Sequence, residues 1–155
     1  MNTDKIWQTN STSSEKTEQL AEQLGRNLKG GEVIELVSDL GGGKTTFARG
    51  LARGFGSKDR VASPTFTISR VYKAGPKAMY HFDFYRLPEP GLIAEELAEV
   101  AGDPLVVTVV EWANIVQDVL PVSRLTVEMH KTPEDERELT FRYPASLQYV
   151  MEGLA

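Results

Sequence analysis

The chain has 155 residues, of which 41% are hydrophobic and 25% are charged, and this balance predicts one domain over residues 1–155 with a sizeable core. The net charge of −5 argues against a broad basic surface for nucleic acid but leaves room for a small basic patch. Cysteine is absent, which excludes disulfides and thiolate metal sites. No apolar run approaches the 18 residues of a membrane-spanning helix, and the N-terminus lacks the layout of a signal peptide, so we expect a cytoplasmic location with no membrane partner.

The first thirty residues predict a strand followed by a helix. Residues 5–9 are expected to form the strand, and Thr12 and Glu15 have the spacing of a capping box at the start of the helix. The helix carries a leucine at every fourth position, which predicts one buried stripe of Leu20, Leu24 and Leu28. A glycine pair then ends the helix.

The next segment is a short apolar strand, a glycine-rich loop and a helix with apolar spacing over residues 45–55. The loop reads SDLGGGKTT from Ser38 onwards. Lys44 can place its ammonium group against the terminal phosphates of a nucleotide, and the Thr45 hydroxyl can join the shell of a Mg²⁺ ion. The helix start points its amide donors at the phosphates. The residues that let backbone amides close around phosphate oxygens are Gly41, Gly42 and Gly43.

One position departs from the phosphate-loop pattern, because Ser38 stands where the pattern has glycine. If the backbone φ angle there is positive, a Cβ atom costs about 1–2 kcal/mol. If the φ angle is negative, serine costs little. A glycine-rich turn that binds nothing is the alternative interpretation, and the strand–loop–helix context favours the nucleotide site.

The rest of the chain predicts strands alternating with helices, followed by a hairpin. This order predicts the α/β fold class, as a three-layer P-loop NTPase-like sandwich with a mixed, mainly parallel sheet and a C-terminal antiparallel hairpin. The ligand should lie beyond the carboxyl ends of the central strands. The expected elements are strands at 67–72, 79–84 and 105–110, a helix at 89–101 with Leu92, Ile93, Leu97 and Val100 on one face, a hairpin of 124–130 and 137–143, and a short helix from residue 146.

A magnesium-bound triphosphate needs an acidic residue at the end of a nearby buried strand. Glu111 directly follows the most apolar predicted strand, and Asp83 ends another. Together with Thr45 and two phosphate oxygens, these carboxylates would suit the hard-oxygen preference of Mg²⁺. The alternative is that each acid is exposed or ion-paired, with Arg86 as an obvious partner for Asp83.

Several other residues near these motifs admit two interpretations. Thr65, in the SPTFT segment of residues 63–67, could offer its hydroxyl to the γ-phosphate as part of a switch, or it could belong to an ordinary strand entry. Taken alone, Trp112 favours core packing and His81 a packed strand histidine. Lys131 and Arg137 could approach the nucleotide, although a solvated hairpin is the simpler expectation. With two histidines and no cysteine, a zinc site is not expected.

Four motifs together resemble one known family. They are DLGGGKTT at residues 39–46, SPTFT at 63–67, HFDFYR at 81–86 and VEW at 110–112. In order and spacing they are similar to the bacterial TsaE (YjeE) family of P-loop ATPases, from the first helix to the late hairpin. The loop alone is common to many proteins, so the other three motifs carry the resemblance.

The resemblance implies an ATPase that uses ATP and Mg²⁺ and supports the formation of threonylcarbamoyladenosine beside the tRNA anticodon. It implies a partnership with the transferase pair TsaB–TsaD, and the acidic pI of about 5.1 fits a protein that reaches tRNA only through those partners. Carried over by motif, the implied catalytic residues are Lys44, Glu111 and Thr65, the magnesium ligands are Thr45, Glu111 and Asp83, and the nucleotide contacts are Gly41, Gly42, Gly43, Lys44, Thr45, Thr46, Trp112, Arg137 and Ser11.

Two rival functions remain open on the sequence. A small-molecule kinase of the same fold would usually add an arginine-rich lid, and the segment after residue 89 is instead acidic, with Glu95 and Glu96 at its centre. A nucleotide-sensing module without turnover is the second rival, because Ser38 leaves the loop affinity in question. The acidic segment is itself a candidate partner face, or simply a solvated helix.

Overall fold

One mixed sheet forms the middle of the molecule. The computed structural model describes residues 4–38, 43–61, 69–85 and 91–154, and within them seven strands pair in the order β1-β7-β6-β2-β5-β4-β3. The strands are β1 (Lys5–Ser11), β2 (Val33–Ser38), β3 (Ser69–Ala74), β4 (Lys77–Asp83), β5 (Val106–Glu111), β6 (Leu125–Lys131) and β7 (Arg137–Tyr143).

The sheet is parallel at its centre and antiparallel at both edges. β2 pairs in parallel with β5 and β6, and β4 pairs in parallel with β5. The predicted hairpin is β6 and β7, and β7 also pairs with β1 at one edge of the sheet. At the other edge β3 pairs antiparallel with β4. The predicted α/β class is confirmed, and the antiparallel pairing of the first strand with β7 is an addition to it.

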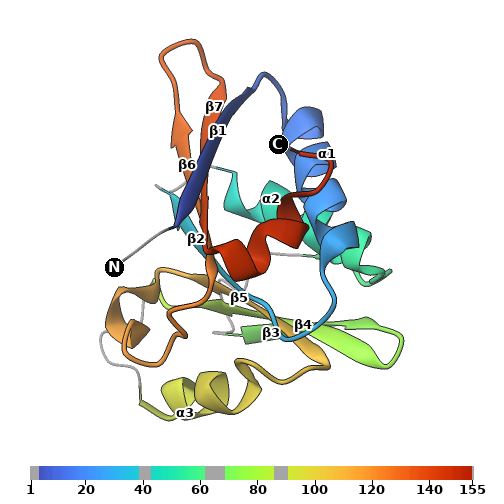
Figure 1. Cartoon of the computed structure of the whole chain (residues 1–155), viewed down its shortest axis with the longest axis vertical. Helices are drawn as coiled ribbons and strands as arrows, with labels where there is room; N and C mark the ends of the chain where they lie inside the picture. Colours follow the sequence, from blue (N-terminus) through green and yellow to red (C-terminus); the bar gives the residue numbers. More distant parts are fainter. Residues whose placement is uncertain (1–3, 39–42, 62–68, 86–90, 155) are drawn as a thin grey trace.

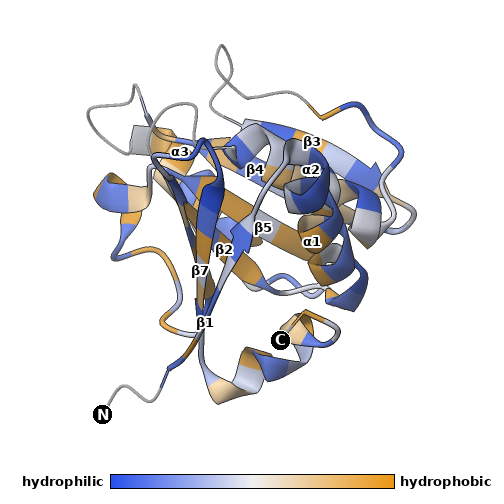
Figure 2. Cartoon of the chain, turned by 90° about the horizontal axis from the view of Figure 1, so that it is seen from above, coloured by the Kyte–Doolittle hydropathy of each residue, from blue (hydrophilic) through white to orange (hydrophobic). Residues whose placement is uncertain are grey.

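Helices cover both faces of the sheet (Figure 1). α1 (Ser14–Asn27), α2 (Lys44–Phe55) and the 3₁₀ helix η2 (Ala145–Met151) pack into one apolar core, and α3 (Gly91–Val100) and the 3₁₀ helix η1 (Ala113–Val116) pack into a second. Hydrophobic residues concentrate on the central strands between these layers (Figure 2). Every residue of β5 is buried, as expected for a parallel strand covered on both faces. Within the described residues, no helix is long and apolar enough to cross a membrane.

The start of α1 lies one residue later than the capping box predicts. Ser13 is the N-cap, and its hydroxyl accepts a hydrogen bond from the amide of Lys16 at 3.2 Å. Thr12 precedes the cap and is exposed. Thr12, Ser13 and Ser14 can all cap a helix, so the spacing in the sequence does not determine which of them is the N-cap. The position of α1 in the packed structure makes Ser13 the N-cap.

α1 and α2 touch through small residues, so the predicted leucine stripe is only partly correct. Leu24 and Leu28 are buried, whereas Leu20 is only partly buried and Ala21 and Gly25 face the partner helix. A Cβ atom on Gly50 would lie 2.4 Å from the carbonyl oxygen of Glu18, which shows how closely the backbones approach. This close approach rotates α1 so that its small residues face α2.

Two other predicted elements differ in detail. Leu92 does not lie on the buried face of α3, because it is 79% exposed while Leu97 is fully buried. The C-terminal helix is a 3₁₀ helix that begins at Ala145, directly after Pro144. The start of the predicted 89–101 helix and the start of the predicted 67–72 strand lie outside the described residues.

Candidate functional site

The predicted phosphate loop, Asp83 and Glu111 converge at one edge of the sheet. Ser38 ends β2, Asp83 ends β4 and Glu111 ends β5, and these are the carboxyl ends of parallel strands. Asp83 and Glu111 are directly paired in the β4–β5 register. α2 begins beside them at Lys44. A candidate site therefore lies beyond the carboxyl ends of the central strands, where ligands of open α/β sheets bind.

Lys44 is held at the start of α2 by a glycine and an acid. Gly43 caps the helix with a φ angle of 103°, a left-handed conformation that favours glycine. The Lys44 ammonium lies 4.0 Å from Glu111 Oε1 and donates a hydrogen bond to the Ser38 carbonyl at 3.3 Å. Lys44 is only 9% exposed, so its charge sits in a poorly hydrated position at a helix N-terminus, which is itself favourable for anions.

Glu111 is fixed from two sides. Its Oε1 faces Lys44, and its Oε2 accepts a hydrogen bond from Nε2 of His81. His81 is fully buried in β4, and its Nδ1 has no hydrogen-bond partner among the described residues. The prediction of a packed strand histidine is therefore confirmed, but His81 also orients Glu111. The alternation of β4 gave a signal for this, since residues 81 and 83 share one face.

Asp83 has fewer described polar contacts than Glu111. Its Oδ1 accepts a hydrogen bond from the amide of Tyr85 at 2.9 Å. Burial raises the pKa of Asp83, and the neighbouring Glu111 carboxylate raises it further, against the opposing effects of the Tyr85 amide, His81 and Lys44. The Asp83–Glu111 pair therefore concentrates negative charge that an added cation would stabilise.

Trp112 joins this site through a strained backbone. Its φ angle of 55° is unusual for a bulky residue and turns the chain directly after Glu111. The indole ring lies 4.9 Å below the Lys44 ammonium and 4.8 Å from the ring of Tyr85. Trp112 also packs, partly buried, against the α3 core. The packing of Trp112 agrees with the interpretation from the residues alone, and its contact with a nucleotide stays a prediction.

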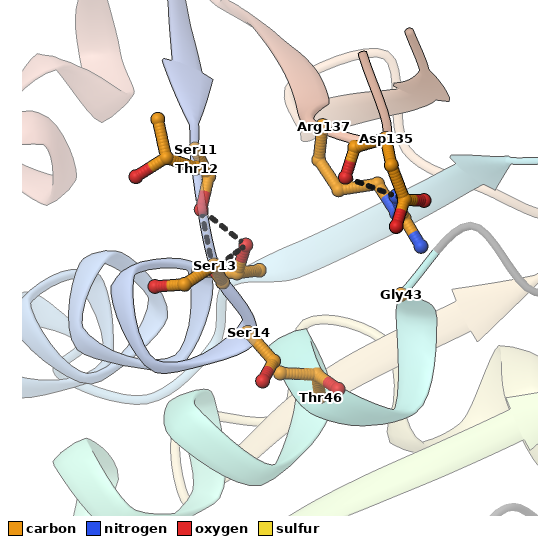
Figure 3. Close-up of a pocket in the computed structure, with 9 residues that line it drawn as sticks. Ser11, Thr12, Ser13, Ser14, Gly43, Thr46, Asp135 and Arg137 are labelled. Carbon is orange, nitrogen blue, oxygen red and sulfur yellow. Dashed lines mark hydrogen bonds and ion pairs between the residues drawn. The ribbon is translucent and has the colours of Figure 1, made fainter. Parts of the chain in front are cut away.

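A hollow lies next to the start of α2, beside the site formed by Lys44, Glu111 and Asp83. It has a volume of about 250 Å³ and is built from the β1–α1 turn, the first turn of α2 and the β6–β7 hairpin (Figure 3). Arg137 extends from the hairpin toward Gly43, where a Cβ atom would lie 4.0 Å from its Nε. The lining is polar: Ser11, Thr12, Ser13, Ser14, Thr17, Gly43, Thr46, Asp135 and Arg137.

The hydroxyl of Ser11 is committed inside this hollow. It donates to the Ser13 carbonyl at 2.8 Å and accepts from the Thr17 hydroxyl at 2.7 Å. Ser11 is 1% exposed, so it shapes the turn that presents the hydroxyls of Thr12 and Ser13. On the opposite wall, Arg137 lies 3.6 Å from the Asp135 carboxylate. The hollow therefore offers hydroxyl groups on one side and a cation on the other.

Comparison with known proteins decides the family. The family model "Threonylcarbamoyl adenosine biosynthesis protein TsaE" matches residues 11–139, which include the whole site described above. The chain belongs to the TsaE family. The tRNA threonylcarbamoyladenosine biosynthesis protein TsaE of Bacillus subtilis is 39% identical over 137 residues, covering 87% of this chain and 83% of that protein. The protein of the same description from Treponema pallidum is 34% identical over 84% of this chain and 96% of its own length.

A solved structure supports the same assignment. The crystal structure of Bacillus subtilis YdiB superposes with a TM-score of 0.79 and 32% sequence identity, covering 98% of this chain and 95% of that chain. The family role of this TsaE member is therefore the biosynthesis of threonylcarbamoyladenosine in tRNA. The resemblance found from the four sequence motifs is confirmed at the level of the family and the fold.

The structure answers the question raised by Ser38 in this TsaE member. Ser38 is the last residue of β2, pairs with Met129 of β6, and is not one of the non-glycine residues with a positive φ angle. Its Cβ atom therefore causes no left-handed strain. What the position contributes to the site is its carbonyl oxygen, which accepts the hydrogen bond from Lys44.

Most predicted site residues of this TsaE member that the structure describes fall into two groups. Lys44, Glu111, Asp83 and Trp112 lie together, and Ser11, Gly43, Thr46 and Arg137 line the adjoining hollow. Thr45 lies in the first turn of α2, between Lys44 and Thr46 in the sequence. Gly41, Gly42 and Thr65 lie outside the described residues, and so does Arg86, the ion-pair partner suggested for Asp83. Lys131 does not line the hollow, since it is exposed and ion-paired with Asp135 at 3.2 Å.

Sequence reasoning missed several lining residues. The capping-box spacing marks Thr12 only as a helix-start residue, and no motif in the sequence marks Ser13, Ser14, Thr17 or Asp135 as lining residues. They approach the phosphate loop because β1 pairs with β7, which places the β1–α1 turn beside the β6–β7 hairpin. No local pattern in the sequence encodes this long-range pairing.

Proposed function

We propose that this TsaE family member binds Mg-ATP at the start of α2 and hydrolyses it as an accessory protein of a TsaB–TsaD-type transferase pair. The observation that carries the proposal is that Lys44, at the start of α2, lies beside Glu111, which is paired with Asp83 at the carboxyl ends of two adjacent strands. A buried lysine at the N-terminus of a helix can bind phosphate groups. Two carboxylates at the ends of neighbouring strands can bind a metal ion.

The phosphates would lie over the amino end of α2. The Gly43 backbone has a left-handed conformation, and the Lys44 ammonium donates to the Ser38 carbonyl at 3.3 Å and lies 4.0 Å from the Glu111 carboxylate. A bound triphosphate would place its β- and γ-phosphates against this ammonium group. Gly41, Gly42 and Thr65 are proposed to complete the loop and the γ-phosphate contact on the strength of the family resemblance.

The donor set fits Mg²⁺. Thr45, Asp83 and Glu111 offer hard oxygen atoms, and Mg²⁺ is usually held by one or two carboxylates together with substrate phosphates and water. Within the described residues no group of three histidine, cysteine or acidic side chains is arranged to hold a metal. When bound, the ion would neutralise phosphate charge. The hydrogen bond from His81 would hold the Glu111 carboxylate in an orientation that faces the ion.

The nucleoside half is proposed to occupy the hollow beside Gly43 and Thr46. Arg137 would meet the ribose or the α-phosphate, and the Thr12 and Ser13 hydroxyls offer hydrogen bonds on the opposite wall. Trp112 would lie on the other side of Lys44, near the terminal phosphates. The TsaB–TsaD pair performs the threonylcarbamoyl transfer, and ATP turnover by this chain would reset that pair, which carries the tRNA.

Phosphate release from Mg-ATP tests this proposal, measured with the purified chain alone and with the TsaB–TsaD pair of its species. We expect slow release alone, strong activation by the pair, and loss of both in Lys44→Ala. The matched control is Lys16→Ala, which removes an exposed cation on α1 and should leave release unchanged. Nucleotide binding with no release under either condition would contradict the ATPase proposal and favour a nucleotide-sensing module.

A further inference from the structure

The central strand β2 carries a buried acid that the candidate ATP site does not use. Glu35 lies between Val33 and Val37 on one face of the strand, because alternate residues of a strand point the same way. It is only 7% exposed. A buried carboxylate costs free energy unless charged and hydrogen-bonding partners replace the lost water. The partners of Glu35 therefore indicate what it does in the fold.

Two side chains from one connection satisfy both carboxylate oxygens of Glu35. Its Oε1 accepts a hydrogen bond from Nε of Arg124 at 3.0 Å, and its Oε2 accepts one from Nε2 of Gln117 at 2.9 Å. Arg124 also donates from Nη2 to Gln117 Oε1 at 2.9 Å, which closes the network. We call Glu35, Gln117 and Arg124 the Glu35 network. Because Gln117 follows η1 and Arg124 precedes β6, the network ties both ends of this connection to the middle of β2.

Gln117 extends the Glu35 network to the backbone beside Trp112. Its Nε2 also donates to the carbonyl of Ala113 at 3.2 Å, and Ala113 is the first residue of η1. Trp112 is the N-cap of η1 and has the φ angle of 55° described above. A strained backbone of this kind persists only where the surrounding structure holds it. η1 has four residues, and short 3₁₀ helices have weak internal hydrogen bonds, so Gln117 supplies a tether that η1 itself lacks.

The Glu35 network also bridges two strands that end at the candidate ATP site. β2 ends at Ser38, before the phosphate loop, and β5 ends at Glu111, directly before Trp112. The indole ring of Trp112 lies 4.9 Å from the ammonium group of Lys44 at the start of α2, within range of a cation–π contact. A shift of η1 relative to β2 would therefore change the distance between Trp112 and Lys44.

We propose that Glu35, Gln117 and Arg124 are positioning residues that hold Trp112 against Lys44. The competing interpretation is an ion pair that only stabilises the fold. A buried ion pair is weak evidence for stability, because apolar residues of similar volume are often as stabilising, whereas a hydrogen-bonded network can favour one arrangement of the segments that it joins. The consequence for nucleotide binding rests on the proposed ATPase function, and the position of Trp112 does not.

The test follows the fluorescence of Trp112 in the full chain. The chain has two tryptophans, and Trp7→Phe removes the other one while keeping an aromatic ring against Phe141. In this background and without nucleotide, Glu35→Gln and Gln117→Ala should each shift the Trp112 emission to the red and increase its quenching by acrylamide. The reason is that the ring would leave a partly buried position for water. Gln117 is exposed, so its variant tests the proposal even if Glu35→Gln fails to fold.

The matched control is Glu32→Gln, which alters a similarly buried carboxylate directly before β2. Glu32 is 5% exposed and accepts hydrogen bonds from the amides of Lys29 and Gly30 and from the Tyr149 hydroxyl. This variant should lower the melting temperature and leave the Trp112 emission unchanged. An equal emission shift in the control would overturn the proposal, because the shift would then reflect a general loosening of the fold. Unchanged emission in folded Glu35→Gln and Gln117→Ala would also overturn it.

Calorimetry of Mg-ATP binding then measures the functional consequence. If a variant keeps the native Trp112 conformation in about a tenth of its molecules, the dissociation constant should rise about tenfold. Phosphate release at saturating Mg-ATP should stay within about twofold, since Lys44 and Glu111 are unaltered. A shifted emission with unchanged Mg-ATP affinity would refute the link to the nucleotide. If the unaltered chain binds no Mg-ATP, the proposed function fails, and the emission still decides whether the network positions Trp112.

Discussion

The buried contact between Lys44 and Glu111 makes a quantitative prediction about stability. The two charges are 4.0 Å apart, and their side chains are 10% and 3% exposed. At an effective dielectric constant of about 20, Coulomb's law gives an attraction of roughly 4 kcal/mol. Desolvation of both groups offsets part of this attraction. We therefore expect a coupling free energy of about 1–3 kcal/mol between the two residues in the protein without nucleotide.

A double-mutant cycle measures this coupling. Lys44→Met keeps the length of the side chain and removes its charge, and Glu111→Gln keeps the shape of the carboxylate. Urea unfolding followed by circular dichroism gives the free energy of unfolding of each single variant, the double variant and the unaltered chain. The double variant should be less destabilised than the sum of the singles by about 1–3 kcal/mol, because each single variant leaves one buried charge without this partner and the double variant removes both charges.

The exposed helical pair of Glu22 and Arg26 is the matched control. Its charges are 3.2 Å apart, but the arginine side chain is 55% exposed. The same cycle with Arg26→Met and Glu22→Gln should give a coupling of only about 0.3–0.5 kcal/mol. A coupling at the Lys44–Glu111 pair no larger than that of the control would refute the description of Lys44 and Glu111 as an electrostatic unit.

Three more predictions follow from the site. His81→Phe should raise the Mg²⁺ concentration for half-maximal ATP hydrolysis about 10- to 100-fold and leave metal-free ATP affinity nearly unchanged, because it removes the hydrogen bond that orients Glu111; equal loss of both would contradict this role. Asp83→Asn should raise the melting temperature at pH 7, because the pKa of Asp83 is raised in the folded state and its ionisation costs stability as pH rises; the gain should vanish below the ordinary pKa of 3.8, and a gain independent of pH from 3 to 8 would be inconsistent with it. Ser38→Gly should not tighten Mg-ATP binding in calorimetry and should cost about 0.5–1 kcal/mol of stability, whereas a tenfold tighter dissociation constant would show that the serine strains the loop.

Local patterns in the sequence predicted much of the fold. The glycine-rich loop, the apolar run of β5 and the helical spacing of α2 are all local features, and each element lies within a few residues of its predicted bounds. The placement of Asp83 and Glu111 at strand ends follows from the same periodicity. Their direct pairing follows once β4 and β5 are parallel neighbours.

The features that were not predicted depend on contacts distant in sequence. β1 has an alternating, half-exposed pattern that fits any edge strand, so its pairing with β7 could not be deduced. The rotation of α1 depends on Gly50 and Gly54 of another helix, where an added Cβ atom would meet a carbonyl oxygen at 2.4 and 2.0 Å. The hydrogen bond from His81 to Glu111 joins β4 to the neighbouring strand β5, which lies far from it in sequence. In each case the sequence shows the residue type, but it does not show which distant residue that residue contacts.

Isothermal titration calorimetry of Mg-ATP binding tests the central claim most directly. The unaltered chain, Lys44→Met and the exposed control Lys16→Met would each be titrated at the same ionic strength. The account predicts one saturable site per chain in the unaltered protein and the control, and no measurable site in Lys44→Met. Equal affinity in all three proteins would contradict the assignment of the nucleotide site to the start of α2.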